Sequence, residues 1–260
     1  AIMALTACTG ARMPDRHVPP FARVPYQPFS RTAVVAIALR EWRLFGSIVD
    51  DDPPGTHPDS VKWEREPGLW QRVGEYWWLG LNADAPERGW TGKHDGDGRV
   101  FPPEDDGTYA WSAAFISYVM RIAGAGPRFP YSADHAVYMN IAKQMFLGTT
   151  HGWLIAAERV EAYTPRPGDI ICMGRGSARG LRFDDLPTGG LFPAHCDIVV
   201  DTQVPNEIAV IGGNIDDAVT LKHVPVTADG KLATPDGTVL DTRWPWMAVL
   251  RVRDEPAPTA

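Results

Sequence analysis

The apolar residues in the first half of the chain recur at helical spacing in three segments. Residues 31–46 and 69–81 carry apolar side chains every three or four positions, which predicts two amphipathic helices. Residues 109–124 are the most apolar of the three, with Thr108 as the expected N-cap and Gly124 as the expected end. The residues expected to face the core are Val34, Val35, Ala38, Leu39, Trp42 and Phe45 in the first helix, Trp70, Val73, Tyr76 and Trp77 in the second, and Ala114, Phe115, Tyr118, Val119 and Ile122 in the third.

The pattern then changes from helical spacing to short apolar runs. A long irregular insertion separates the second and third helices, and Ser132 is the expected cap of a fourth helix with His135 and Tyr138 near one face. Further on, short apolar runs between Gly, Pro, Asn and Asp predict strands. The predicted strands are Asp169–Met173, Cys196–Asp201, Glu207–Gly212, Val219–Val226 and Met247–Val252. Helices followed by an antiparallel sheet predict the α+β class.

The length and the net charge of the chain limit its possible architecture and the class of its partners. The chain has 260 residues, 44% of them hydrophobic, which is enough for one sizeable core. We expect a single domain over residues 31–253, followed by a flexible tail over 254–260. The formal charge of −7 argues against nucleic acid as a partner, because phosphate binding needs a basic face.

The N-terminal segment Leu5-Thr6-Ala7-Cys8 resembles the lipobox of bacterial lipoproteins, which are cleaved before the cysteine and lipidated on it. Residues 1–8 then represent the remnant of a signal, and residues 9–30, with five prolines, a tether. This predicts a periplasmic protein on a lipid anchor in the Gram-negative envelope, at the outer membrane. The alternative is a chance match of four residues.

The cysteine count follows from the same segment. If Cys8 is acylated, Cys172 and Cys196 remain, each on a predicted strand. An even pair of cysteines in an oxidising compartment predicts a disulfide between them.

Ser112 and His195 are the candidate catalytic pair. Ser112 falls in the first turn of a predicted helix, where free N–H groups and the helix dipole stabilise a developing anion. His195 begins a strand, and strand alternation places it on one face with Asp197, away from Cys196. A nucleophile at a helix N-terminus facing a strand histidine is the arrangement of papain-like hydrolases. The alternative for His195 is a satisfied core histidine.

Five segments carry a resemblance to a known family. The Trp111-Ser-Ala-Ala-Phe-Ile-Ser segment is similar to the Trp-Cys-Ala-Ala-Phe-Val-Ser segment of CHAP-type cell-wall amidases, with Ser112 in place of their cysteine. Together with Glu41-Trp42, Val73-Gly-Glu-Tyr-Trp77, Pro167-Gly-Asp-Ile-Ile-Cys172 and His195-Cys-Asp-Ile-Val-Val200, it resembles domain-of-unknown-function family 2272, relatives of the NlpC and CHAP fold.

The resemblance implies a papain-like fold and a set of site residues. Asn214 matches the asparagine that orients the catalytic histidine in CHAP-type sites, and Gly212 stands where those sites carry a glutamate. The alternative is that this Gly-Gly-Asn segment is only a turn. The resemblance also places Trp111, His135, Arg175 and Asp197 in the pocket.

The implied activity is hydrolysis of an amide bond in peptidoglycan stem peptides or a related envelope peptide, without a metal or an organic cofactor. Ser112 would be the nucleophile, His195 the base and Asn214 its orienting group. The main alternative is an inactive module of the same fold that binds a cell-wall fragment or a protein. A structural lipoprotein with a vestigial cleft is a third class.

Overall fold

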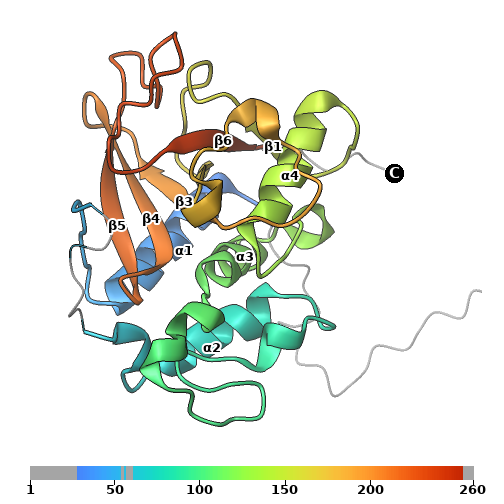
Figure 1. Cartoon of the computed structure of the whole chain (residues 1–260), viewed down its shortest axis with the longest axis vertical. Coiled ribbons are helices and arrows are strands. Elements are labelled where there is room, and N and C mark those ends of the chain that lie inside the picture. The colour runs from blue at the N-terminus through green and yellow to red at the C-terminus, as the bar shows by residue number, and fades with distance from the viewer. Residues whose placement is uncertain (1–27, 54–55, 57–60, 254–260) are drawn as a thin grey trace, which may run out of the picture.

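Helices on one side of a curled antiparallel sheet form the molecule (Figure 1), so the α+β prediction is confirmed. The computed structural model describes residues 28–53, 56 and 61–253. The predictions for Cys8, for the tether up to residue 27 and for the tail lie outside these residues. The longer helices are α1 (Arg31–Leu44), α2 (Leu69–Gly80), α3 (Ser112–Ile122) and α4 (His135–Leu147). None of the helices in the described part of the chain is long and apolar enough to cross a membrane.

Six antiparallel strands lie in the order β1-β6-β2-β3-β4-β5. Five of them are the predicted strands with shifted ends: β2 (Ile170–Gly174), β3 (Ala194–Asp201), β4 (Glu207–Ile215), β5 (Ala218–Pro225) and β6 (Trp246–Val252). Strand β1 (Ile155–Glu158) was not predicted, because four residues show too little alternation. It pairs with β6 at the edge of the sheet.

Alternating side chains of the sheet supply two separate cores. One set, which includes Cys196, Ile198 and Ile211, packs with the apolar faces of the helices. The opposite set, which includes Ile171, Val199 and Val210, packs with Leu232 and Ala233 from the long segment between β5 and β6. The sheet is therefore covered on both faces, and polar residues within its strands have little access to water.

Two predicted helix caps were wrong. Helix α3 begins at Ser112 with Trp111 as its N-cap, and Thr108 lies in a preceding 3₁₀ helix (Pro103–Tyr109). Helix α4 begins at His135, and the Ser132 hydroxyl accepts the Asp134 N–H in a turn before it. At α4 a local turn takes up the Ser132 hydroxyl that was expected to cap the helix. The consequence for α3 is that Ser112 is its first residue.

One predicted core position was also wrong. Ile122 is 44% exposed, because α3 reaches the surface in its last turn. The other end of the same helix is fully buried.

Helix α3 begins where β3 and β4 separate. These strands pair from Ile198 and Ile211 onward, whereas β3 continues back to Ala194 beside β2 alone. Beyond the last pair, β4 passes directly under the helix: a Cβ added to Gly213 would lie 2.7 Å from both Phe115 and Trp111. The fork between the two strands therefore opens toward the N-terminus of α3.

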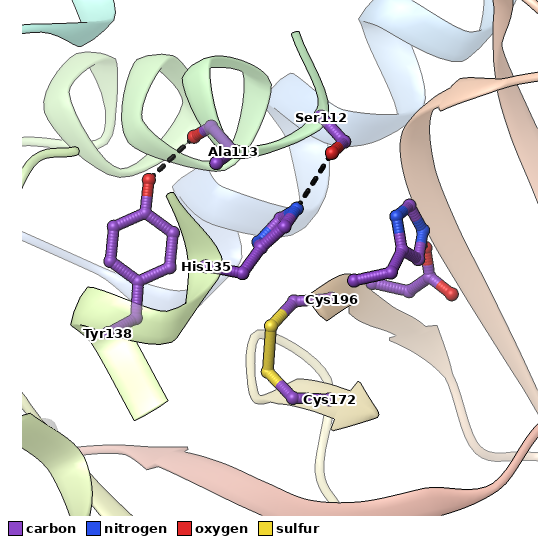
Figure 2. Close-up of a disulfide and its surroundings, with 8 residues drawn as sticks. Ser112, Ala113, His135, Tyr138, Cys172 and Cys196 are labelled. Atoms are coloured by element: carbon purple, nitrogen blue, oxygen red, sulfur yellow. Dashed lines mark hydrogen bonds and ion pairs between the residues drawn. A yellow bond between two sulfur atoms is a disulfide. The ribbon is translucent and has the colours of Figure 1, made fainter. Parts of the chain in front are cut away.

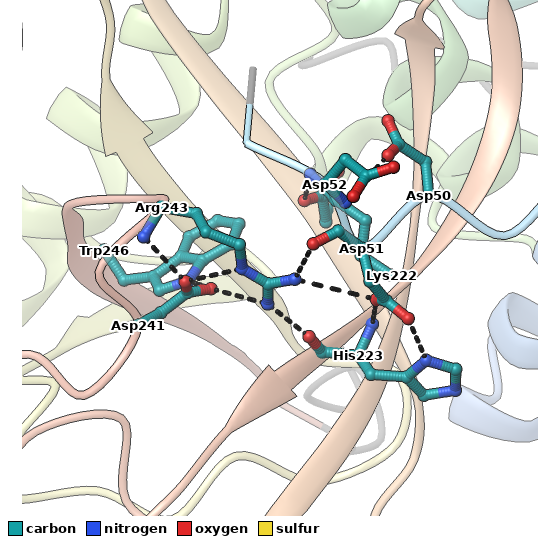
Figure 3. A network of polar contacts seen from close by, with 9 residues as sticks. Asp50, Asp51, Asp52, Lys222, His223, Asp241, Arg243 and Trp246 are labelled. Atoms are coloured by element: carbon teal, nitrogen blue, oxygen red, sulfur yellow. Dashed lines mark hydrogen bonds and ion pairs between the residues drawn. The ribbon is translucent and has the colours of Figure 1, made fainter. Parts of the chain in front are cut away.

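A polar network fixes the far side of β5. The Asp51 carboxylate lies 2.8 Å from His223 Nδ1, and the Arg243 guanidinium donates to the backbone carbonyls of Asp51 and His223 and to the Asp241 carboxylate (Figure 3). This network ties the segment after α1 and the segment before β6 to one strand. Lys222, the neighbour of His223 on β5, points in the opposite direction, into the protein.

Candidate functional site

The Ser112 hydroxyl is held by a histidine from α4. Ser112 Oγ lies 2.9 Å from His135 Nε2, and both residues are buried (Figure 2). One turn along α4, the Tyr138 hydroxyl donates to the Ala113 carbonyl at 2.6 Å. His135 and Tyr138 therefore lie on one face of α4, as the sequence predicted, and that face fixes the first turn of α3.

His195 forms the second half of the site. Its Nε2 lies 2.8 Å from Asp197 Oδ1, so the two side chains share the face that strand alternation predicted. The rings of His195 and His135 lie edge to face with their centroids 5.5 Å apart. His195 Nδ1 is buried and has no hydrogen-bond partner among the described residues. The hydrogen bond of Ser112 therefore goes to His135 and not to His195, whose ring packs against that of His135.

A buried lysine completes the chain of contacts behind His195. Lys222 Nζ lies 2.6 Å from Asp197 Oδ2, and both side chains have no exposed surface. The ammonium also lies 4.5 Å from the ring centroid of Trp244. Sequence reasoning missed Lys222, although a lysine at an inward position of the apolar β5 was a signal for a buried charge that needs a partner.

These contacts and the burial of the site shift the pKa values of its residues. Burial lowers the pKa of His195 below its ordinary value, although Asp197 works in the opposite direction. Burial lowers the pKa of His135 further, and the neighbouring His195 adds to this effect. For Asp197, burial alone would raise the pKa, but Lys222 and His195 hold it well below the usual range. The site at neutral pH therefore contains two neutral imidazoles and one carboxylate.

The predicted role of Asn214 was wrong. His195 Nε2 contacts Asp197 and its Nδ1 has no partner among the described residues, so Asn214, at a φ of 56° in an irregular part of β4, does not hold the imidazole. Asp197 instead orients His195 and lies beside Gly212: a Cβ at Gly212 would lie 1.8 Å from Asp197 Oδ1. Gly212, which the resemblance was expected to place where CHAP-type sites carry a glutamate, thus leaves the space in which the Asp197 carboxylate lies.

Two of the predicted pocket residues lie behind the pocket instead. Trp111 is fully buried, and its indole N–H donates to the Glu64 carboxylate. Asp197 has no exposed surface. The apolar and ionic partners of these side chains lie in the protein interior, so neither reaches the cleft.

A cleft of about 500 Å³ lies over the start of α3. Ser112, His135 and Arg175 line it, as predicted for the last two from the resemblance. Glu87 and Asp134 line it as well and were not predicted. The first turn of α3 contributes backbone N–H groups that have no partner within the helix, so an anion formed at Ser112 has donors beside it.

A disulfide fixes the sheet below this cleft. Cys172 and Cys196 are directly opposite each other on β2 and β3 and are joined by a disulfide, with a Cα–Cα distance of 4.2 Å (Figure 2). Cys196 lies between His195 and Asp197 in the sequence and points to the other face of the strand. The crosslink therefore holds the strand that carries the histidine.

One group of three carboxylates in the described part of the chain has the spacing of a metal site. The oxygens of Glu64, Asp106 and Asp217 lie within 4.8 Å of one another. Lys62 Nζ already lies 3.2 Å from Asp106 and 2.6 Å from Asp217. The third carboxylate, Glu64, accepts the Trp111 indole N–H. Lys62 and the Trp111 indole therefore already occupy the three carboxylates. None of the three lines the cleft.

Comparison with known proteins identifies one family. A family model described as "Uncharacterized protein conserved in bacteria (DUF2272)" matches residues 64–252. No curated protein and no solved structure matches the chain. The match covers the cleft, the His195–Asp197–Lys222 contacts and the disulfide.

Proposed function

The chain belongs to the DUF2272 family, and we propose that it is an amide hydrolase with a papain-like fold of the NlpC/CHAP type, in which a serine replaces the usual cysteine. One observation carries this proposal: Ser112 is the first residue of a buried helix, its hydroxyl contacts His135, and the ring of His135 packs against a second histidine, His195, that is backed by a carboxylate. A nucleophile, a base and an orienting group are the parts that acyl transfer needs.

In this mechanism His195 is the base. An imidazole that accepts a proton becomes a cation, and a buried cation needs a counter-charge. Asp197 provides that charge to His195 at 2.8 Å, whereas His135 Nδ1 has no partner among the described residues. In the reaction the Ser112 hydroxyl would leave its hydrogen bond with His135 and give its proton to Nδ1 of His195, which has no partner among the described residues.

The reaction would proceed in two steps. Ser112 Oγ attacks the carbonyl carbon of the amide while His195 takes its proton, and the backbone N–H groups of the first turn of α3 stabilise the oxyanion. His195 then protonates the leaving amine. Water hydrolyses the acyl-serine with the same histidine as the base, which restores the enzyme. His135 Nε2–H would hold the hydroxyl between turnovers.

The proposed substrate is an amide in peptidoglycan stem peptides or a related envelope peptide. The lipobox-like Leu5-Thr6-Ala7-Cys8 and the Cys172–Cys196 disulfide support a location outside the cytoplasm, since disulfides persist in oxidising compartments. A lipid on Cys8 would attach the protein to the membrane. Expression of the complete gene with Cys8→Ala, followed by membrane fractionation, tests the anchor.

Substitution of Ser112 tests the activity. Soluble peptidoglycan fragments incubated with the protein should release new amino groups, and Ser112→Ala should abolish this release while the protein stays folded. A wild-type protein that binds the fragments but cleaves none would support the alternative, a binding module of the same fold.

A further inference from the structure

Three charged side chains line the cleft. Arg175, Glu87 and Asp134 line the same cleft as Ser112, and within the described residues none of their side chains forms an ion pair or a hydrogen bond. The buried charges behind His195 differ in this respect, since Lys222 is paired with Asp197. Arg175 and Asp134 are exposed and Glu87 is half-buried, so all three are available to a bound molecule.

The positive charge lies close to the reacting groups. Arg175 directly follows β2, and its backbone N–H bonds the Pro193 carbonyl, which places it beside the start of β3. Its charge contributes to the lowered pKa values of both His135 and His195. A guanidinium in this position is suited to bind a carboxylate, which it can hold with two parallel hydrogen bonds.

The two negative charges of the lining lie near each other. Asp134 immediately precedes His135, and Glu87 comes from the irregular segment between α2 and α3. Burial raises the pKa of Asp134 above its ordinary value, and the nearby charge of Glu87 adds to this effect. Two carboxylates that repel each other in a cleft would be stabilised by a bound ammonium group.

The opposite charges of the lining do not neutralise each other, although salt bridges form elsewhere around the fold. We propose that the cleft recognises a zwitterionic peptide, whose carboxylate binds Arg175 and whose ammonium group binds Glu87 and Asp134. This inference rests on the proposed function, since it names the substrate class of that site. Trp90 and Phe192, which also line the cleft, would cover the apolar part of such a peptide.

Binding to the Ser112→Ala protein tests the inference without any need for hydrolysis. The probes are di-, tri- and tetra-alanine, each with free ends, with an acetylated N-terminus, with an amidated C-terminus, and with both ends blocked. Trp77 and Trp90 line the cleft, so their fluorescence can report binding, with calorimetry as a second readout. At one length or more, the peptide with free ends should bind roughly tenfold more tightly than either singly blocked peptide.

Charge-neutralising variants assign each end of the peptide. In the Ser112→Ala background, Arg175→Gln should remove the preference for a free C-terminus and leave the preference for a free N-terminus. Glu87→Gln and Asp134→Asn should do the reverse. Arg182→Gln and Glu104→Gln, which change exposed charges that do not line the cleft, are the matched controls and should change neither preference.

Two results would overturn the inference. One is that the four end-modified forms bind with equal affinity at every peptide length, or that none of them binds. The other is an equal change in affinity for all four peptides in the Arg175 and Glu87 variants, which would show that these residues act only on the fold. Charge-dependent binding in a protein whose wild type cleaves no peptide would sustain the inference and contradict the hydrolase instead.

Discussion

Lys222 Nζ lies 2.6 Å from Asp197 Oδ2, and neither side chain has any exposed surface. The other oxygen of the same carboxylate lies 2.8 Å from His195 Nε2. The contacts thus run from β5 to β3, past Gly212 on the strand between them, which has no side chain to block the carboxylate. A lysine that keeps Asp197 ionised also fixes the tautomer of His195, with the proton on Nε2 and the lone pair on Nδ1.

The first prediction concerns the pH dependence of activity in Lys222→Met. The positive charge of Lys222 disfavours a protonated His195 and so lowers the pKa of that imidazole. Removing this charge raises the pKa, so the base becomes protonated at a higher pH. We expect the acid limb of kcat/KM against pH to move upward by about one pH unit.

Stability measurements accompany this test. Asp197 would remain buried without its cation, so the free energy of unfolding should fall by about 3 kcal/mol. Lys231→Met, which removes a partly exposed lysine paired with Asp229, is the control and should change neither quantity. An unchanged acid limb in a folded Lys222→Met protein would limit Lys222 to a structural role.

The second prediction separates the two histidines. His195→Gln should lower kcat/KM by about a thousandfold, because no other group there can take the proton of Ser112 and be stabilised as a cation. His135→Gln should lower it by only about tenfold, since a glutamine can still donate a hydrogen bond to the hydroxyl. The acid limb of kcat/KM against pH for His135→Gln should lie at the same pH as that of the wild type. The opposite ranking of the two variants would make His135 the base.

The third prediction concerns Glu64, which accepts the Trp111 indole N–H at the other side of α3. Burial raises the pKa of Glu64 to about 8 from its ordinary value of 4.5. Between these values the folded protein holds a proton that the unfolded chain has released, so stability falls as the pH rises. Glu64→Gln keeps an acceptor for Trp111 and has no proton to lose.

Denaturant unfolding at several pH values checks this. Glu64→Gln and the wild type should have similar free energies of unfolding near pH 4, and the variant should be more stable by about 4 kcal/mol at pH 8. Glu66→Gln removes an exposed carboxylate two residues away and is the control. Parallel curves for Glu64→Gln and the wild type would show that folding does not raise the pKa of Glu64.

The sequence predicted most of the fold, because periodic burial leaves a periodic pattern. The stripe of α2 and the strand with His195 and Asp197 on one face both appear in the structure at the predicted positions. The helix starts were predicted less well. Thr108 lies in a 3₁₀ helix and the Ser132 hydroxyl bonds within a local turn, and the spacing of apolar residues reveals neither feature. A strand of four residues such as β1 carries too little signal to be recognised.

The candidate site could be predicted only in part. Ser112 and His195 follow from local patterns, namely a helix start and a strand start. The contacts that complete the site join distant segments: His135 comes 23 residues after Ser112 in the sequence. Lys222 reaches Asp197 across an intervening strand because that strand has a glycine there. The resemblance to CHAP-type sites led to the expectation that Asn214 orients His195, but in the structure Asp197 contacts that ring.

The last prediction concerns the environment of Ser112, and it holds whether or not the natural serine is active. Ser112→Cys places a thiol at the first position of α3, where unpaired N–H groups and the helix dipole stabilise a thiolate. The hydrogen bond of a buried histidine adds to this effect. In a Cys8→Ser background, with Cys172 and Cys196 held in their disulfide, iodoacetamide should alkylate the new thiol faster than an ordinary exposed cysteine.

Thr108→Cys is the matched control, because it lines the same cleft but lies before the helix begins. Adding His195→Gln to Ser112→Cys should slow the alkylation if His195 Nδ1 takes the proton of the nucleophile. Equal rates for the two engineered thiols would mean that the start of α3 does not stabilise a negative charge, and would remove the electrostatic basis of the proposed hydrolysis.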